Sequence, residues 1–428
     1  MDLAPFFATR GRSDGCRGFV GPFPSTPLDA YGYVSKRIAP PSTLCDVAET
    51  TDLIRRLLAR VLADAHRHQA GVGGEWGAVQ PLSRRRRAVD AVAAGAARLG
   101  INRRAYDPGD AAARLAATVE HAEGLAATEA LLADEASRDL LLALLSFRVL
   151  GPRHVALPVP ERQFREDCGR VERELRVETD VLREMHGHPL HRYEIPGREG
   201  PVSVIGLAFL VHEFFGVEQY ALDRGGYRVR AERGDVVVDG GGGWGETALY
   251  FADAVGPDGH VLCCEFVPEN LDIVDRNLAL NPALRERIEV VRGPLWDRAG
   301  EVIEYSRSGG ASSLVHLGDA VRAQARTQSV DELCRSRGID RIDLIKLDVE
   351  GAEMHALRGA RETIRRHLPK LAISVYHQDV DLVDIPAWIA GLGLGYELHL
   401  DHLWPGPEET ILFARPIQRP APVGSTEP

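Results

Sequence analysis

The sequence predicts an α/β protein in which a mostly parallel sheet follows an α-helical region. Three observations support this prediction. Short apolar segments alternate with helical patterns after about residue 230, one such segment runs directly into four glycines, and the first third shows helical spacing alone. Repeated strand and helix alternation is typical of a parallel sheet covered on both faces. The expected strands are 236–239, 261–265, 288–292, 342–348 and 371–376.

The composition and the spacing of apolar residues divide the chain into four parts. Residues 1–50 are rich in proline and glycine and predict an irregular arm. Residues 51–185 place apolar side chains such as Leu53, Leu57 and Val61 at helical spacing, which predicts a helical domain that serves as a substrate lid or an oligomerisation surface. The α/β domain is expected at 190–416, and a flexible tail at 417–428.

Composition excludes several classes of function. At 428 residues the chain is long enough for two or three domains, and its formal net charge of −11 argues against a nucleic-acid partner. Six scattered cysteines without a CxxC pair fit the reduced thiols of the cytosol. The longest apolar run, 140–147, is far shorter than the roughly 20 residues that span a bilayer, and the first residues lack signal-peptide character. We expect a cytoplasmic protein with no membrane partner.

The strand at 236–239 ends in a glycine turn that can approach a ligand closely. Gly240 to Gly243 follow Asp239, and helical character resumes after Gly245. Glycine lacks Cβ, so a ligand can lie against this backbone, and the following helix offers free N–H groups. Gly240, Gly242 and Gly245 also satisfy GxGxxG, so the sequence leaves a nicotinamide dinucleotide open as an alternative ligand.

Three acidic residues, Asp239, Glu265 and Asp348, fall at expected strand ends. Ligands of doubly wound sheets bind beyond these ends, and Glu265 lies where a carboxylate commonly accepts both ribose hydroxyls. Asp239 at the turn would repel a pyrophosphate but attract the ammonium of a methionyl group, which favours S-adenosylmethionine. An expected antiparallel pair at 396–400 and 410–414 is also typical of methyltransferase sheets.

Several segments together resemble the FkbM-type family of S-adenosylmethionine-dependent methyltransferases. The resemblance covers about residues 135–415, and the KLDVEGAE block is its most specific part. The other segments are VVDGGGGWGETALYFA, EFVPENLDIVDRNLALNP, SVYHQDVDLVDIPAWI and ETILFA. Upstream, LLLALLSFRVLGPRHVALP and VEQYAL also resemble longer members of the family.

The resemblance implies a class I methyltransferase fold with a Rossmann-like sheet, and methyl transfer, usually to a hydroxyl. Glu265 would hold the ribose and Asp348 would face the reacting centre. The acidic residue that often meets adenine is not evident, so Trp296 or Asp297 is expected to serve there. The methionine moiety would lie against Gly240, Gly241, Gly243 and Gly245.

A hydroxyl acceptor must lose its proton during methyl transfer, so the site needs a base. Asp348 and His377, each just after a strand, are the candidate catalytic residues. A divalent cation held by Asp348, His377 and a third acid would also acidify the hydroxyl. Glu353 is better interpreted as complementing the dipole of a helix start. Lys346 lies in a buried strand and needs an acidic partner such as Glu350.

The sequence therefore favours an S-adenosylmethionine-dependent O-methyltransferase that acts on a small-molecule natural product or a glycosyl acceptor. One alternative is an NAD(P)-dependent oxidoreductase, although no convincing hydride-handling pair is present. The other is a non-catalytic scaffold that recruits a partner through its helices. The N-terminal helices and the loop at 306–316 are expected to form the acceptor pocket, and those helices are also candidates for a homo-oligomer interface.

Overall fold

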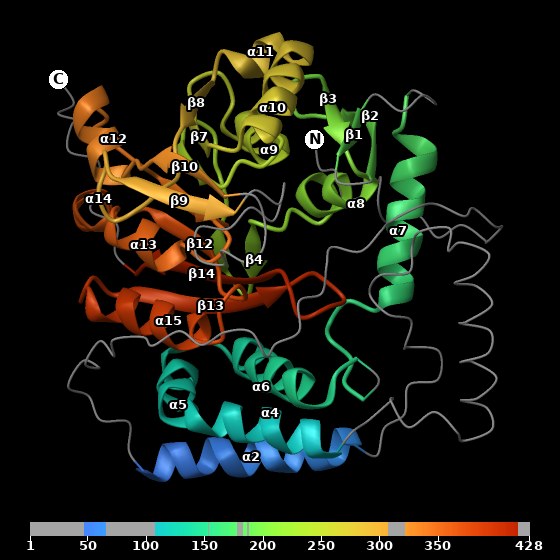
Figure 1. Ribbon diagram of the computed structural model, residues 1–428, viewed down its shortest axis with the longest axis vertical. Helices are drawn as coiled ribbons and strands as arrows, with labels where there is room; N and C mark the ends of the chain where they lie inside the picture. Colours follow the sequence, from blue (N-terminus) through green and yellow to red (C-terminus); the bar gives the residue numbers. More distant parts are fainter. Residues whose placement is uncertain are drawn as a thin grey trace.

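The computed structural model describes residues 47–65, 108–152, 154–177, 183–185, 188–306 and 322–417 (Figure 1). Nearly all of the expected arm, the loop at 306–316 and the tail lie outside the described residues. Among those described, no helix is both long and apolar enough to cross a membrane.

A sheet of seven strands organises the described part of the chain, in the order β13-β14-β12-β11-β6-β7-β8. Every neighbouring pair is parallel except those of β14, which runs antiparallel to both β12 and β13. The predicted fold class is confirmed. The antiparallel strand lies inside the sheet, between β12 and β13, so β13 and not β14 forms the edge. The strands are β6 Val236–Gly240, β7 His260–Glu265, β8 Ile288–Arg292, β11 Leu344–Leu347, β12 Lys370–Ser374, β13 Tyr396–His402 and β14 Thr410–Pro416.

Helices cover both faces of the sheet. Successive strand residues point to opposite sides, so apolar side chains on both faces need a covering layer. In β6, Val237 packs in one apolar cluster with Ala248 of α9, while Val238 packs in another with Leu357 of α13. Both valines are fully buried, as expected for a parallel sheet. These helices are α9 Glu246–Val255, α10 Pro268–Leu280, α11 Pro282–Arg285, α12 Val330–Arg337, α13 Glu353–Arg358, α14 Arg361–His367 and α15 Asp381–Gly391.

The described N-terminal helices share their core with the sheet. Leu53 of α2 and Leu141 of α6 belong to the same buried cluster as Leu398 of β13. Asp134 caps α6 by accepting a hydrogen bond from the Ser137 N–H, and Gly151 ends the helix. Figure 1 shows these helices stacked beyond the β13 edge. They are α2 Val47–Ala65, α4 Pro108–Glu120, α5 Ala122–Leu131 and α6 Glu135–Leu150, followed by α7 Glu161–Glu174.

Short elements outside the main sheet complete the described fold. A π-helical turn, η2, lies between α8 and β4; π-helical turns occur frequently at functional sites. The hairpin of β9 and β10 is inserted between β8 and β11. The bounds are β1 Arg183–Met185, β2 His188–Pro196, β3 Pro201–Gly206, α8 Ala208–Val211, η2 His212–Gly216, β4 Leu222–Arg224, β5 Tyr227–Val229, β9 Val302–Ser306 and β10 Arg322–Arg326.

Candidate active site

The glycine turn after β6 has a conformation that only glycine can supply. Gly241 has φ +80°, and a Cβ placed on it would lie 1.8 Å from the backbone oxygen of Asp348. That separation is far below van der Waals contact, and the backbone region is one that L side chains avoid. The close approach of these two backbones therefore depends on Gly241.

Hydrogen bonds hold the turn between the ends of its two neighbouring strands. The N–H groups of Gly241 and Gly242 both donate to the Cys264 carbonyl at 3.0 Å, and the Asp348 N–H donates to the Gly240 carbonyl at 3.0 Å. Cys264 precedes Glu265 at the end of β7, and Asp348 follows β11. The structure thus brings Glu265 and Asp348, both expected at strand ends, to the two sides of the turn.

Asp239 is fully buried and contacts the turn through a lysine. Its Oδ1 lies 3.0 Å from Lys346 Nζ, and its Oδ2 accepts a hydrogen bond from the Thr247 hydroxyl at 2.7 Å. Lys346 stands opposite Asp239 in the register of β11 and β6, and Nζ also donates to the Gly240 and Gly241 carbonyls at 3.1 and 2.7 Å. Lys346 therefore has an acidic partner, but it is Asp239 rather than Glu350.

This arrangement keeps Lys346 charged. Burial alone would lower its pKa, but the carboxylates of Asp239 and Asp348 raise it above the ordinary value. Asp239 consequently acts on the turn through Lys346, which binds two of the turn's carbonyls. A direct contact between Asp239 and a methionyl ammonium stays a prediction.

The carboxylate of Glu265 is fixed at the end of β7. Its Oε1 accepts hydrogen bonds from the Phe266 and Val267 N–H groups at 2.6 and 2.8 Å, and its Oε2 accepts one from the Asn270 side chain at 3.2 Å. Burial raises the pKa of Glu265, while these donors oppose that rise. A carboxylate held this way can accept hydroxyl donors in a defined direction.

An apolar cluster adjoins Glu265 and contains Trp296. Val267 and Tyr305 are buried there, and Phe266 and Trp296 pack against them. Trp296 also stacks on His355, with ring centroids 3.7 Å apart and planes 7° from parallel. Asp297, the alternative candidate, lies with its Oδ2 3.0 Å from His355 Nδ1. The placement of Trp296 suits an adenine contact, which stays a prediction.

A second group of side chains gathers where β11 and β12 end. Asp348, Glu353 and His377 each place one possible ligand atom within 4.8 Å of the other two. His377 Nδ1 lies 3.0 Å from Glu353 Oε1, while His377 Nε2 lies 3.5 Å from Asp348 Oδ1 and 3.6 Å from Glu350 Oε2. The structure therefore brings the two predicted catalytic residues together, and Glu353 joins them.

Sequence reasoning missed the polar side chains around Asp348. Tyr220 donates a hydrogen bond to Asp348 Oδ2 at 2.7 Å, and the Tyr376 hydroxyl lies 3.2 Å from Oδ1. Tyr376 also contacts Glu409 at 3.0 Å, and Gln219 donates to Glu409 at 2.6 Å. These residues lie in or beside segments quoted for the family resemblance, but no spacing along the chain marks them as neighbours of Asp348.

Protonation differs sharply within this acidic group. Burial would raise the pKa of Asp348, but His377, Lys346 and the two tyrosyl hydroxyls lower it, so this carboxylate is ionised. Burial would lower the pKa of His377, but Glu353, Glu350 and Asp348 raise it well above its ordinary value. An imidazolium has no lone pair for a proton. Of the two predicted bases, Asp348 is thus the better suited.

Further acids line this region. Burial, together with the Asp348 charge, raises the pKa of Glu409 to about 8, and burial raises that of Glu350 to about 7. Glu213 of η2 is buried as well, and its pKa is raised by burial and by Glu409. Glu350 and Glu409 both have positive φ, at 53° and 63°, a conformation retained only where the surroundings enforce it. The region is strongly acidic and therefore suited to cationic groups.

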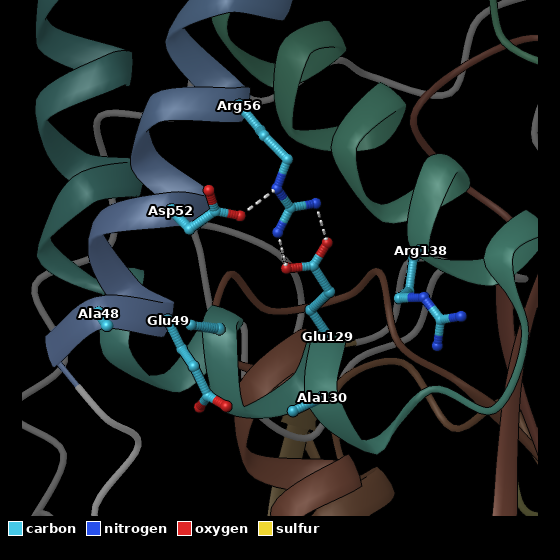
Figure 2. A pocket seen from close by; sticks show the side chains of 8 residues that line it. Ala48, Glu49, Asp52, Arg56, Glu129, Ala130 and Arg138 are labelled. Atoms are coloured by element: carbon cyan, nitrogen blue, oxygen red, sulfur yellow. Dashed lines mark hydrogen bonds and ion pairs between the residues drawn. The ribbon is translucent and has the colours of Figure 1, made fainter.

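A separate hollow lies among the N-terminal helices (Figure 2). Arg56 of α2 makes a forked ion pair with Glu129 of α5 and also contacts Asp52, while Arg138 points away from them. The charged groups of Arg56, Asp52 and Glu129 in this hollow are therefore paired with one another. Its lining includes none of the predicted site residues.

The sheet order, the glycine turn and the strand-end carboxylates define a class I methyltransferase fold. Residues 227–398 match the family profile described as the methyltransferase FkbM domain. The resemblance inferred from the sequence is confirmed for this part of the chain.

Comparisons with individual proteins are more distant. The chain is similar to Methyltransferase sdnD of Sordaria araneosa, with 28% identity over 158 residues that cover 29% of this chain and 60% of that protein's length. Among solved structures it is similar to methyltransferase FkbM from Methylobacillus flagellatus KT, at 20% identity and a TM-score of 0.45, covering 78% of this chain and 72% of that one. The chain is also similar to fibrillarin from Aeropyrum pernix, solved with natively bound S-adenosyl-L-methionine. The identity is 16% and the TM-score 0.30, and the match covers 56% of this chain and 99% of that one.

Proposed function

We propose that this protein is an S-adenosylmethionine-dependent O-methyltransferase that acts on a hydroxyl of a small-molecule or glycosyl acceptor. The single observation that supports this most is the glycine turn held between two strand ends, with Glu265 on one side and Asp348 on the other. Ligands of this fold class bind beyond the carboxyl ends of the strands, where these groups lie.

Different residues of the chain would contact different parts of the cofactor. Glu265 would accept the ribose hydroxyls, and Trp296 with its apolar neighbours would cover the adenine. Gly240, Gly241, Gly243 and Gly245 would lie against the methionine moiety, whose amino group would find the acidic surroundings favourable. When bound, the cofactor supplies an electrophilic methyl group on a sulfonium.

The acceptor would lie on the Asp348 side of the turn. The acceptor hydroxyl would lose its proton as the methyl group passes from sulfur to oxygen, and Asp348 would take that proton. The hydrogen bond from Tyr220 holds Asp348 Oδ2, so the carboxylate has a fixed orientation. Alignment of the attacking oxygen is the main contribution that a protein makes to such a transfer.

The proposal also includes the location of the protein, its partners and its oligomeric state. We also propose a cytoplasmic location and no nucleic-acid partner, which the scattered cysteines and the net charge of −11 support. A homo-oligomer through the N-terminal helices is supported by two exposed leucines of α2, Leu58 and Leu62, whose exposed fractions are 38% and 65%.

The test is to incubate the full chain with S-adenosylmethionine that carries an isotopically labelled methyl group, together with a pool of hydroxylated metabolites. Mass spectrometry should detect a product heavier by one labelled methyl group, and blocking the acceptor hydroxyl should abolish it. Labelled product that forms equally from the hydroxyl-blocked acceptor would contradict O-methylation, and reduction of a nicotinamide cofactor instead would contradict methyl transfer.

A further inference from the structure

We propose that Asp348, Glu353 and His377 form a binding site for a first-row divalent cation of the Mn²⁺ type. Two carboxylates and an imidazole are a donor set that these ions accept, since carboxylates suit Mn²⁺ and imidazole suits the later metals of the row. Asp348 directly follows β11, His377 lies three residues beyond the end of β12, and Glu353 is the first residue of α13, so the fold itself assembles them.

The spacing of the donor atoms fits an ion between them. Cis ligands at about 2.1 Å from an octahedral cation lie about 3.0 Å apart, and trans ligands about 4.2 Å apart. His377 Nδ1 and Glu353 Oε1 are separated by 3.0 Å, and one donor atom from each of the three residues lies within 4.8 Å of the others. The 3.0 Å separation matches a cis pair of ligands, and three protein donors would leave the other octahedral positions to further ligands.

Glu353 provides the second, independent observation. Its side chain is fully buried, yet Oε2 has no hydrogen-bond partner among the described residues. Its Oε1 accepts a hydrogen bond from the Val349 N–H at 2.8 Å, which turns the carboxylate towards His377. His377 Nδ1 lies 3.0 Å from Oε1, so the imidazole and the carboxylate face each other. A buried carboxylate oxygen without a donor is costly unless a cation satisfies it.

The remaining contacts support the same assignment. Tyr220 and Tyr376 contact the two oxygens of Asp348 at 2.7 and 3.2 Å, and such outer contacts orient metal ligands. Glu350 Oε2 lies 3.6 Å from His377 Nε2 and adds a further acidic group beside the site. A bound ion would displace the proton of His377, as metal binding to imidazole requires.

The catalytic consequence rests on the proposed function, whereas the binding itself does not. A cation at the end of β11 would lie on the acceptor side of the glycine turn. There it could coordinate the acceptor oxygen and make its hydroxyl more acidic.

The experiment is a titration of Mn²⁺ into the full chain after treatment with a chelator and its removal, with free Mn²⁺ measured by electron paramagnetic resonance. The wild type should bind one Mn²⁺ per chain, and Zn²⁺ should displace it. Glu353→Gln should weaken binding at least 10-fold, whereas Glu286→Gln, the same change at an exposed position, should leave it unchanged. Asp348→Asn serves as the second site variant if Glu353→Gln does not fold.

Two results would overturn the site: a wild-type chain that binds no Mn²⁺ at millimolar concentration, or site variants that bind it as the wild type does. Binding of S-adenosylhomocysteine is measured on the same samples. A chain that binds this product analogue but no cation would refute the metal site and leave the proposed methyl transfer intact. Turnover that is unaffected by the chelator would refute the catalytic consequence.

Discussion

The glycine turn and the acidic group lie side by side, but they differ in charge balance: a buried lysine pairs with the acid of the turn, whereas several acids share one histidine in the acidic group. Lys346 engages Asp239 and two turn carbonyls, and backbone N–H groups hold the turn on both sides. In the acidic group, Glu353 Oε2 lacks a hydrogen-bond partner among the described residues. A satisfied buried network makes the local structure rigid, whereas an unpaired buried polar group is costly. We therefore expect the turn to position ligands and the acidic group to provide the chemistry.

The largest effect should come from breaking the turn itself. Gly241→Val should lower the free energy of unfolding by about 5 kcal/mol, because the side chain collides with the Asp348 backbone in an unfavourable backbone region. The matched control is Gly225→Val. Gly225 also has positive φ, but open space surrounds it, so the cost should be only about 1–2 kcal/mol. Urea unfolding measures both, and equal costs would contradict the role of the close approach.

Removing the positive charge of Lys346 beside the turn should have the next largest effect. Lys346→Met leaves the buried Asp239 carboxylate without its partner and should cost about 3–5 kcal/mol of stability. Adding Asp239→Asn should recover part of that loss, because the uncompensated charge disappears. Chemical denaturation of the single and double variants tests this. A double variant less stable than Lys346→Met would show that Asp239 does not depend on Lys346.

A change on the acidic side should affect chemistry more than structure. Asp348→Asn should lower turnover by roughly 10²- to 10⁴-fold, the usual contribution of a general base. Its affinity for S-adenosylhomocysteine should change much less, because the turn is held by the Asp348 backbone rather than by its side chain. Steady-state kinetics and calorimetry separate the two quantities. Wild-type turnover in this variant would remove Asp348 from the mechanism.

The smallest effect of the four should come from Glu265. Glu265→Gln should weaken binding of S-adenosylhomocysteine by roughly 10- to 100-fold, which corresponds to lost charge-assisted hydrogen bonds of about 1.5–3 kcal/mol. The exposed Glu286→Gln should bind as tightly as the wild type. If both variants bound equally well, Glu265 would have no part in holding the ribose.

The features that depend on local pattern could be predicted from the sequence. The alternation of strands and helices located β6, β7, β8, β11 and β12, and therefore placed Glu265 and Asp348 at one edge of the sheet. The antiparallel pairing of the last two strands was also predictable. The position of β14 between β12 and β13 was not predictable, because strand order depends on tertiary packing rather than on local pattern.

Contacts between distant segments could not be predicted in the same way. Lys346 clearly needed an acid, but only the register of β11 and β6 shows that the acid is Asp239. Tyr220 reaches Asp348 from a segment 128 residues earlier, and Glu409 reaches Tyr376 from 33 residues later. Glu353 fits a helix start in sequence and does contact the Val349 N–H there. Its proximity to His377 follows from the adjacency of β11 and β12.

The most direct measurement of the central claim is the equilibrium binding of S-adenosylhomocysteine and of NAD(H) to the full chain by isothermal titration calorimetry. We predict that S-adenosylhomocysteine binds with one site per chain, that Glu265→Gln weakens this binding, and that NAD(H) gives no saturable heat. Saturable binding of NAD(H) without binding of S-adenosylhomocysteine would contradict the account.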